Sequence, residues 1–163
     1  MTGPIAVQYP AIFEWIAAQL AELRLAHSDD LDHLSEEYRR GKQSLDVYRL
    51  GYLGELIVRH WLVEKNYPFE SSPLFATKNY IAPDLIVGGK GVDVKTVPQY
   101  ARELQVNEKA HKKSKGVSQY AFVKPTGMQT ANLWWVTHDE VSAWELVTST
   151  YTPLYRYVIP QTS

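Results

Sequence analysis

The chain has 163 residues, 45% hydrophobic and 21% charged, which is an ordinary globular mixture that argues against disorder and fits one domain. A net charge of −1 predicts no polyanion binding, and the absence of cysteine excludes disulfides, thiolate zinc sites and cysteine nucleophiles. No apolar run approaches the roughly 18 residues that span a bilayer, and the N-terminus lacks a signal-peptide pattern, so we expect a cytoplasmic protein with no membrane partner.

The first half of the chain is predicted to be mainly helical. Residues 11–25 have apolar side chains at helical spacing, and Ser28 or Asp29 is a plausible N-cap for a further helix. A long helix is expected over residues 44–64, followed by a short strand near residues 68–71. The expected inward stripe of the long helix comprises Val47, Leu50, Gly54, Ile57, Val58, Trp61 and Leu62.

A hairpin is expected next, with strands at residues 81–87 and 92–97 around the turn Gly88-Gly-Lys-Gly91. Residues 104–106 are predicted to be extended. Asn107 is predicted to cap a helix that runs through Lys115 and ends at Gly116. Further strands are expected at residues 120–124, 132–137 and 153–159, with a short helix over 139–146. The fold class is therefore α/β, with helices flanking a central mixed sheet.

Charged residues in this hairpin raise the question of function, because charges on a buried strand need partners. Asp93 and Lys95 are two residues apart, so they share a face of the strand. A loop of Gly89-Lys90, or of residues 88–91, places Asp84 opposite Lys95 and Ile86 opposite Asp93, whereas a three-residue loop separates the two acids. The symmetric turns thus bring Asp84, Asp93 and Lys95 together, with an apolar opposite face of Leu85, Val87, Val92 and Val94.

Two converging carboxylates repel each other, and a divalent cation relieves that repulsion. Oxygen ligands favour a hard ion such as Mg²⁺, and a neighbouring lysine can act on a water or stabilise charge on a phosphate. The combination suits phosphodiester hydrolysis. The alternative is a half-exposed hairpin whose Asp and Lys side chains are ordinary solvated residues.

Pro83-Asp84 followed by Asp93-Val94-Lys95 resembles the PD-(D/E)xK motif of the restriction-endonuclease-like nuclease superfamily. Glu55 in Gly51-Tyr-Leu-Gly54-Glu55 is similar to the helix glutamate of many members. The expected order of helix, three strands, helix and strand also resembles that superfamily's αβββαβ core. The resemblance implies one nuclease-like domain over 1–163, with an N-terminal helical extension (1–43), a catalytic core (44–125) and a C-terminal strand-helix-strand extension (126–163).

The resemblance further implies a role for each residue of the motif. Asp84 and Asp93 would bind Mg²⁺, or Mn²⁺ in its place, with the backbone carbonyl of Val94 completing the shell. Lys95 would act on the attacking water, and Glu55 would support the metal or its waters. DNA is the implied substrate, and a homodimer is expected because many relatives cut both strands as dimers.

Basic and polar residues after the motif are candidate nucleic-acid contacts. Residues 101–125 contain six basic and two acidic side chains, and at least two of Lys109, Lys112 and Lys113 are expected on one helix face, where they could bind phosphates. Gln105 on the next strand, His111 on the helix and Gln99 are further candidates; the orientation of Gln99 stays open because Pro98 intervenes.

Two hypotheses remain at this point, a Mg²⁺-dependent deoxyribonuclease and a non-catalytic nucleic-acid- or protein-binding module on the same fold. The presence of both Asp84 and Asp93 favours the nuclease, because a non-catalytic module on this fold has no need for two carboxylates that repel each other. The weak overall charge favours the binding module.

Overall fold

The computed structural model describes residues 1–26, 41–74, 83–114 and 116–161, so the predicted cap at Ser28 or Asp29 lies outside the described residues. The described helices are α1 (Ile12–Ala26), α2 (Gly41–Glu64), α3 (Glu108–Lys113) and α4 (His138–Ser142). The described strands are β1 (Thr2–Gln8), β2 (Phe69–Ser71), β3 (Leu85–Val87), β4 (Lys90–Thr96), β5 (Glu103–Asn107), β6 (Val117–Gly127), β7 (Thr130–Thr137), β8 (Glu145–Val147) and β9 (Leu154–Val158). No described helix has the length and hydropathy that a membrane crossing requires.

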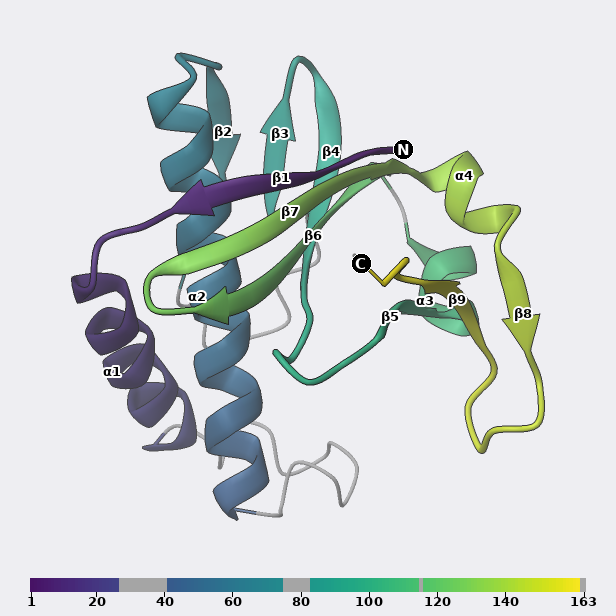
Figure 1. The fold of residues 1–163 in the computed structure, drawn as a ribbon, viewed down its shortest axis with the longest axis horizontal. Helices are drawn as coiled ribbons and strands as arrows, with labels where there is room; N and C mark the ends of the chain where they lie inside the picture. The colour runs from purple at the N-terminus through teal and green to yellow at the C-terminus, as the bar shows by residue number, and fades with distance from the viewer. Residues whose placement is uncertain (27–40, 75–82, 115, 162–163) are drawn as a thin grey trace.

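The expected mixed sheet lies at the centre of the molecule (Figure 1). Its strand order is β1-β7-β6-β4-β3-β2, with β4 and β6 parallel and the other neighbours antiparallel. A second sheet of order β5-β9-β8 lies to one side of it. Gln105, expected on the strand after Lys95, lies on β5, which follows β4 along the chain but pairs with β9 in this second sheet.

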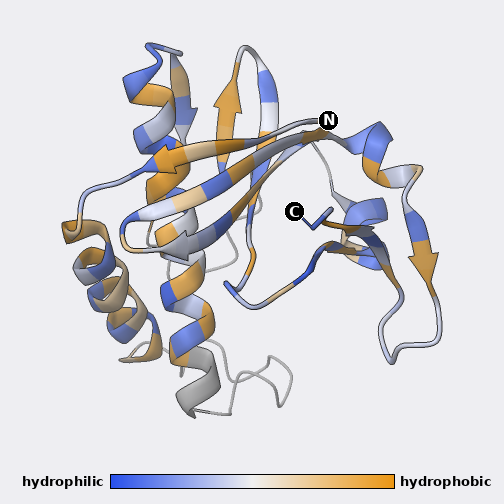
Figure 2. Ribbon diagram, viewed as in Figure 1, coloured by the Kyte–Doolittle hydropathy of each residue, from blue (hydrophilic) through white to orange (hydrophobic). Residues whose placement is uncertain are grey.

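Helices α1 and α2 form a layer against one face of the central sheet (Figure 1). The apolar stripe of α2 contacts buried strand residues, including Leu85 and Val92, as the alternation along the hairpin predicts. Hydrophobic positions recur along α2 and along the strands of the central sheet (Figure 2). Leu53, which the predicted stripe omits, is buried, whereas Val47, which the stripe includes, is 63% exposed. Gly54 permits the close approach of α2 to β4, because a Cβ there would lie 1.9 Å from the Thr96 Oγ1 atom.

A second hydrophobic cluster fills the other face of the sheet. Tyr120, Phe122 and Trp134 point into it, together with Leu104 of β5 and Val141 of α4. Their neighbours along β6 and β7 point to the α2 side, so both strands are buried on both faces. On β4, Val92 and Val94 lie on the α2 side, whereas Asp93 and Lys95 are neighbours of Tyr120 and Phe122 and lie on the opposite face.

Several element boundaries differ from the sequence-based expectations. Strand β1 was not expected, and it forms an edge of the central sheet by pairing with β7. The predicted helix over 139–146 ends at Ser142, and its last predicted residues belong to β8. Helix α3 begins as predicted, with the Asn107 Oδ1 atom accepting the Ala110 N–H at 3.0 Å, but it ends at Lys113.

Candidate active site

The β3–β4 hairpin turns at Gly88-Gly89, where φ is +58° and +75°, values that favour glycine. Leu85 pairs with Val92 and Val87 with Lys90, so the ladder continued by one residue sets Asp84 across from Asp93. The predicted pairs Asp84–Lys95 and Ile86–Asp93 are therefore wrong. The register differs from the expected one by two residues, which preserves the side-chain faces, so the two aspartates still converge.

Asp93 and Lys95 share a face of β4, as their spacing predicts. The Lys95 Nζ atom lies 2.8 Å from the Asp93 Oδ2 atom. The parallel pairing of β4 with β6 sets Asp93 beside Tyr120 and Lys95 beside Phe122. Both charged side chains therefore lie on the face of the sheet away from α2, next to the second hydrophobic cluster.

Asp84 lies just before β3 begins, at a point where β3 no longer pairs with β4. Its side chain there supplies the hydrogen-bond acceptor that a strand backbone would otherwise provide. Its Oδ2 atom accepts the Val94 N–H at 2.8 Å. The N–H and C=O groups of one strand residue point to the same side, so the Val94 carbonyl faces this same uncovered edge of β4. That orientation matches the role that the motif resemblance implies for the Val94 carbonyl.

Hydrogen bonds from α2 and the residue after β2 fix the segment that carries Asp84. The Ser72 N–H donates to the Asp84 carbonyl at 3.0 Å, and the Ser72 hydroxyl donates to the Pro83 carbonyl at 2.7 Å. Arg59 on α2 in turn donates from Nη2 to the Ser72 carbonyl at 2.8 Å. The position of the Asp84 carboxyl group is thus determined at both its backbone and its side chain.

Glu55, Asp84 and Asp93 form an acidic cluster whose members change one another's protonation. Burial, a hydrogen bond with Asp93 and the charges of Asp93 and Glu55 raise the pKa of Asp84 to about 9. Burial also raises the pKa of Glu55, while a hydrogen bond with Asp84 and the nearby Arg59 act in the opposite direction. Without a cation, burial and mutual repulsion therefore favour a protonated carboxyl group within this cluster.

The cluster fits a hard divalent cation by the chemistry of its donors, which are carboxylate and carbonyl oxygens. Burial and the neighbouring Asp93 and Glu55 carboxylates disfavour the ionised form of Asp84, and a cation beside these groups would favour it. In the described parts of the chain, no three His, Asp or Glu side chains are already arranged around one ion position. The donors that would hold such a cation are Asp84, Asp93 and the Val94 carbonyl, with Glu55 beside them.

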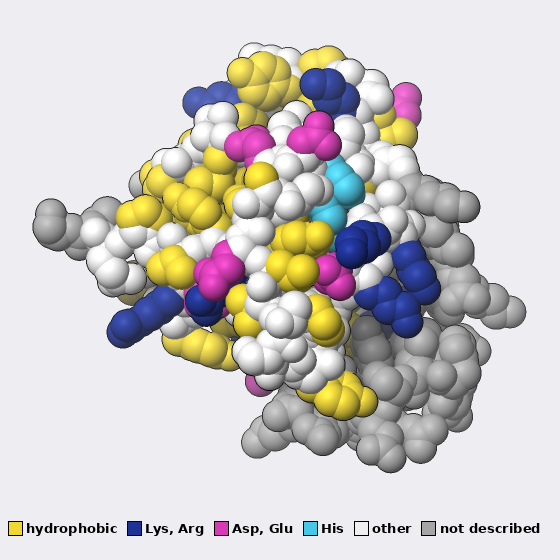
Figure 3. All heavy atoms as spheres, turned by 90° about the vertical axis from the view of Figure 1, so that its right-hand side faces the viewer, with side chains coloured by type: hydrophobic (Ala, Val, Ile, Leu, Met, Phe, Trp, Pro, Cys, Tyr) yellow, Lys and Arg dark blue, Asp and Glu magenta, His cyan; other side chains and the backbone are white. Residues whose placement is uncertain are grey.

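The three predicted phosphate-binding lysines lie on α3 and not in the acidic cluster. Lys109, Lys112 and Lys113 are all exposed, and the Lys112 Nζ atom lies 3.3 Å from the Glu108 Oε2 atom. On the face of the molecule that carries α3, α4 and β8, basic side chains lie among acidic ones and do not form one continuous basic field (Figure 3). A role for these lysines in binding nucleic acid stays a prediction.

The three polar candidates have different positions. Gln105 lines a cavity together with Lys95, although it lies in the second sheet. Gln99 turns away from Lys95, and its Nε2 atom donates to the Thr126 carbonyl at 3.3 Å. His111 is buried at 2% exposure between the Tyr120 hydroxyl, at 2.7 Å from Nδ1, and the Ser142 hydroxyl, at 2.8 Å from Nε2.

Arg59, Ser72 and Tyr120 belong to the site or border it, and none is a sequence-based candidate. Arg59 follows Glu55 by four residues on α2, and residues at that spacing lie on the same face of a helix. The sequence alone could therefore have predicted that Arg59 lies near Glu55. Ser72 and Tyr120 are placed by strand pairing, which the local sequence pattern does not specify.

Comparison of the chain with protein-family models, with curated proteins and with solved structures found no match. The functional argument therefore depends on the geometry and chemistry of the site itself.

Proposed function

We propose that this chain is a divalent-metal-dependent nuclease that hydrolyses phosphodiester bonds in DNA. The observation that carries the proposal is the convergence of Asp84 and Asp93 across the open end of the β3–β4 hairpin, with the Lys95 ammonium group 2.8 Å from Asp93. The motif resemblance adds support, since α2 is followed by β2, β3 and β4, and then by α3 and β6, with β5 inserted before α3.

Each residue of the proposed site has a role that follows from its position. Asp84 and Asp93 hold a Mg²⁺ ion from two adjacent strands, with the Val94 carbonyl facing the same edge, and Glu55 approaches from α2. When bound, Mg²⁺ supplies an activated water and neutralises charge that develops on the phosphate. Lys95 orients that water or stabilises the phosphate oxygens through its ammonium group. Arg59 and Ser72 hold the Asp84 segment in place.

Cleavage of supercoiled plasmid tests the proposal. We expect nicked or linear product with Mg²⁺ or Mn²⁺ and none with EDTA. Lys95→Ala should lower the rate by about 10²-fold or more, since a positioned acid–base or charge-stabilising group contributes on the order of 10²–10⁴-fold. Lys90→Ala is the matched control, because Lys90 lies at the start of the same strand and is exposed. It should cleave like wild type.

The outcomes separate the nuclease from the binding module. Equal cleavage by wild type and Lys95→Ala, with both proteins folded by circular dichroism, would overturn the assigned mechanism. Absence of cleavage combined with salt-sensitive DNA binding would favour the non-catalytic module.

A further inference from the structure

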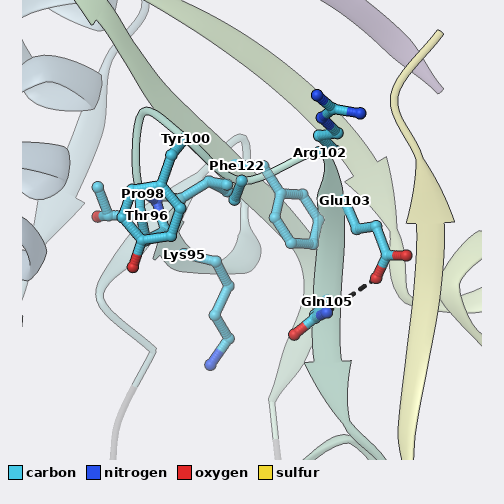
Figure 4. A pocket seen from close by; sticks show the side chains of 10 residues that line it. Lys95, Thr96, Pro98, Tyr100, Arg102, Glu103, Gln105 and Phe122 are labelled. Atoms are coloured by element: carbon cyan, nitrogen blue, oxygen red, sulfur yellow. Dashed lines mark hydrogen bonds between the residues drawn. The ribbon is translucent and has the colours of Figure 1, made fainter.

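A cavity of about 510 Å³ opens beside Lys95, and none of the proposed metal ligands lines it (Figure 4). Its base is formed by Lys95 and Phe122, which are neighbours across the β4–β6 pairing. Pro98 and Tyr100 lie on one side, and Glu103 and Gln105 of β5 lie on the other. Its volume falls in the range of about 300–1,000 Å³ that is typical of small-molecule sites.

The cavity has an aromatic wall and a polar wall. The Tyr100 side chain is 86% exposed, and burying its ring against a flat ligand would remove that surface from water. On the polar wall, the Gln105 Nε2 atom donates to the Glu103 carboxylate at 2.9 Å. Arg156 lies 3.3 Å from the same carboxylate, so the acidic side chain that lines the cavity is paired, while Lys95 and Arg102 contribute positive charge.

The loop that carries Tyr100 is held at both ends and in its middle. The Val97 N–H donates to the Val123 carbonyl at 2.7 Å, and the Ala101 N–H donates to the Pro98 carbonyl at 3.0 Å. The Lys124 ammonium group donates to the Ala101 carbonyl at 2.5 Å. The Tyr100 ring is therefore exposed on an anchored backbone, which lowers the conformational entropy lost when a ligand packs against it.

We propose that this cavity binds one unpaired nucleobase of the DNA strand whose phosphate is held at Lys95, an inference that rests on the proposed function. The base stacks on Tyr100, and the Gln105 amide contacts its polar edge. A paired base cannot enter, because its faces are covered by neighbouring bases and its edge is occupied by the opposite strand. The preferred substrate is accordingly DNA with an unpaired nucleotide next to the cut bond, as in a single strand or in a duplex that opens at that nucleotide.

Equilibrium binding without metal tests the cavity separately from catalysis. Fluorescence anisotropy in EDTA is measured with a single strand, a duplex that has one unpaired nucleotide and a fully paired duplex. We expect the first two to bind at least tenfold more tightly than the paired duplex. Tyr100→Ala should weaken only those two, by about 5- to 150-fold, as expected for loss of one stacking aromatic. Tyr100→Phe, which keeps the ring, should bind like wild type.

Tyr151→Ala is the matched control, because Tyr151 is fully exposed in the turn between β8 and β9 and does not line this cavity. It should leave all three affinities unchanged. Equal affinities of wild type and Tyr100→Ala, equal binding of paired and unpaired substrates, or no binding at all would overturn the cavity assignment. Metal-dependent cleavage that requires Lys95 would survive such a result. Conversely, Tyr100-dependent binding without any cleavage would retain the cavity and reject the nuclease.

Discussion

The carboxyl group of Asp84 has two roles that oppose each other in the metal-free protein. It accepts the Val94 N–H just before β3 begins, which favours the ionised form, and it lies beside Asp93 and Glu55, which favour the protonated form. Burial adds to the second effect, and the pKa rises to about 9. The residue that is proposed to hold a cation is therefore destabilising at neutral pH until a cation arrives.

Asp84→Asn should stabilise the metal-free protein. The unfolded Asp84 carboxyl has a pKa near 3.8 and the folded one about 9, so folding binds a proton between these values. The corresponding stability is fully present below pH 3.8 and is lost as pH rises toward 9. The melting temperature of Asp84→Asn should thus exceed that of wild type by a margin that grows from pH 4 to pH 9. Differential scanning fluorimetry across this range measures it.

Addition of Mg²⁺ supplies the second half of that test. Wild type should gain melting temperature with Mg²⁺, because a ligand that binds only the native state stabilises it, and Asp84→Asn should gain much less. Asp46→Asn is the control, since the Asp46 side chain is 77% exposed on α2, and it should respond to Mg²⁺ like wild type. A uniform response of all three proteins would contradict cation binding at Asp84.

His111 is expected to be neutral at physiological pH. Burial, the nearby His138 and Lys112 lower its pKa from 6.5 to about 4, and its ring stacks on His138 with centroids 3.6 Å apart. The unfolded state binds more protons between pH 4 and 6.5, so the free energy of unfolding should fall as pH drops through this range. His111→Gln should show a smaller fall. NMR titration of the imidazole checks the pKa directly, and a value near 6.5 would contradict the assignment.

The sequence was sufficient to predict which charged residues of the hairpin converge, but not how they pair. Strand alternation alone places Asp93 with Lys95, and either symmetric turn brings in Asp84. The observed turn is Gly88-Gly89, which is neither of the symmetric turns expected from the sequence, and it shifts the partner of Asp84 from Lys95 to Asp93. The anchoring of Asp84 by Ser72 depends on contacts between separate segments, which no local pattern records.

At the scale of single elements, the two glycines of α2 have different environments. A Cβ at Gly54 would lie 1.9 Å from the Thr96 Oγ1 atom and 3.0 Å from the Thr96 Cβ, so rotation of the Thr96 side chain does not remove the clash. A Cβ at Gly51 would have no heavy atom within 4 Å. The same substitution should therefore have opposite effects one helical turn apart.

Gly54→Ala should lower the free energy of unfolding by about 1–3 kcal/mol, the usual cost of overpacking, despite the helical preference for Ala. It should also reduce cleavage, because α2 must move away from β4 and carries Glu55 with it. Gly51→Ala is the control and should be neutral or more stable by about 0.4–1 kcal/mol. Urea denaturation followed by circular dichroism measures both. A Gly54→Ala protein as stable as wild type would contradict the close contact.

Helices and strands were predicted correctly where a local periodic pattern determines them. They were missed where the structure depends on pairing with a strand that is distant in the sequence. The long apolar stripe of α2, the alternation of β4 and the short apolar run of β6 identify those elements locally. Strand β1 and strand β8 form because β7 and β9 offer edges to pair with. The residues of β8 follow a helical turn whose capping box the sequence does encode at Thr137 and Glu140, and pairing with β9 ends that helix early.

At the scale of the whole molecule, β6 and β7 join two hydrophobic clusters into one structure. Ala121 and Leu133 belong to the cluster under α2, whereas Phe122 and Trp134, the next residues along each strand, belong to the cluster under the second sheet. Neither cluster can lose its packing without exposing the opposite face of the same two strands. The candidate site lies where β4 borders both clusters, so its geometry depends on both being intact.

The two clusters should therefore unfold together. Leu53→Ala in the first cluster and Leu104→Ala in the second each remove a side chain that is at most 1% exposed, which should cost about 2–5 kcal/mol. Each variant should shift a single urea transition, with circular dichroism and tryptophan fluorescence giving the same midpoint. Leu23→Ala, at a leucine that is 50% exposed on α1, should move that midpoint far less. A separate early transition in Leu104→Ala would contradict this expectation and would make the second sheet an independently unfolding unit. Strand β5, which lines the cavity at Lys95, would then unfold while the acidic cluster stays folded.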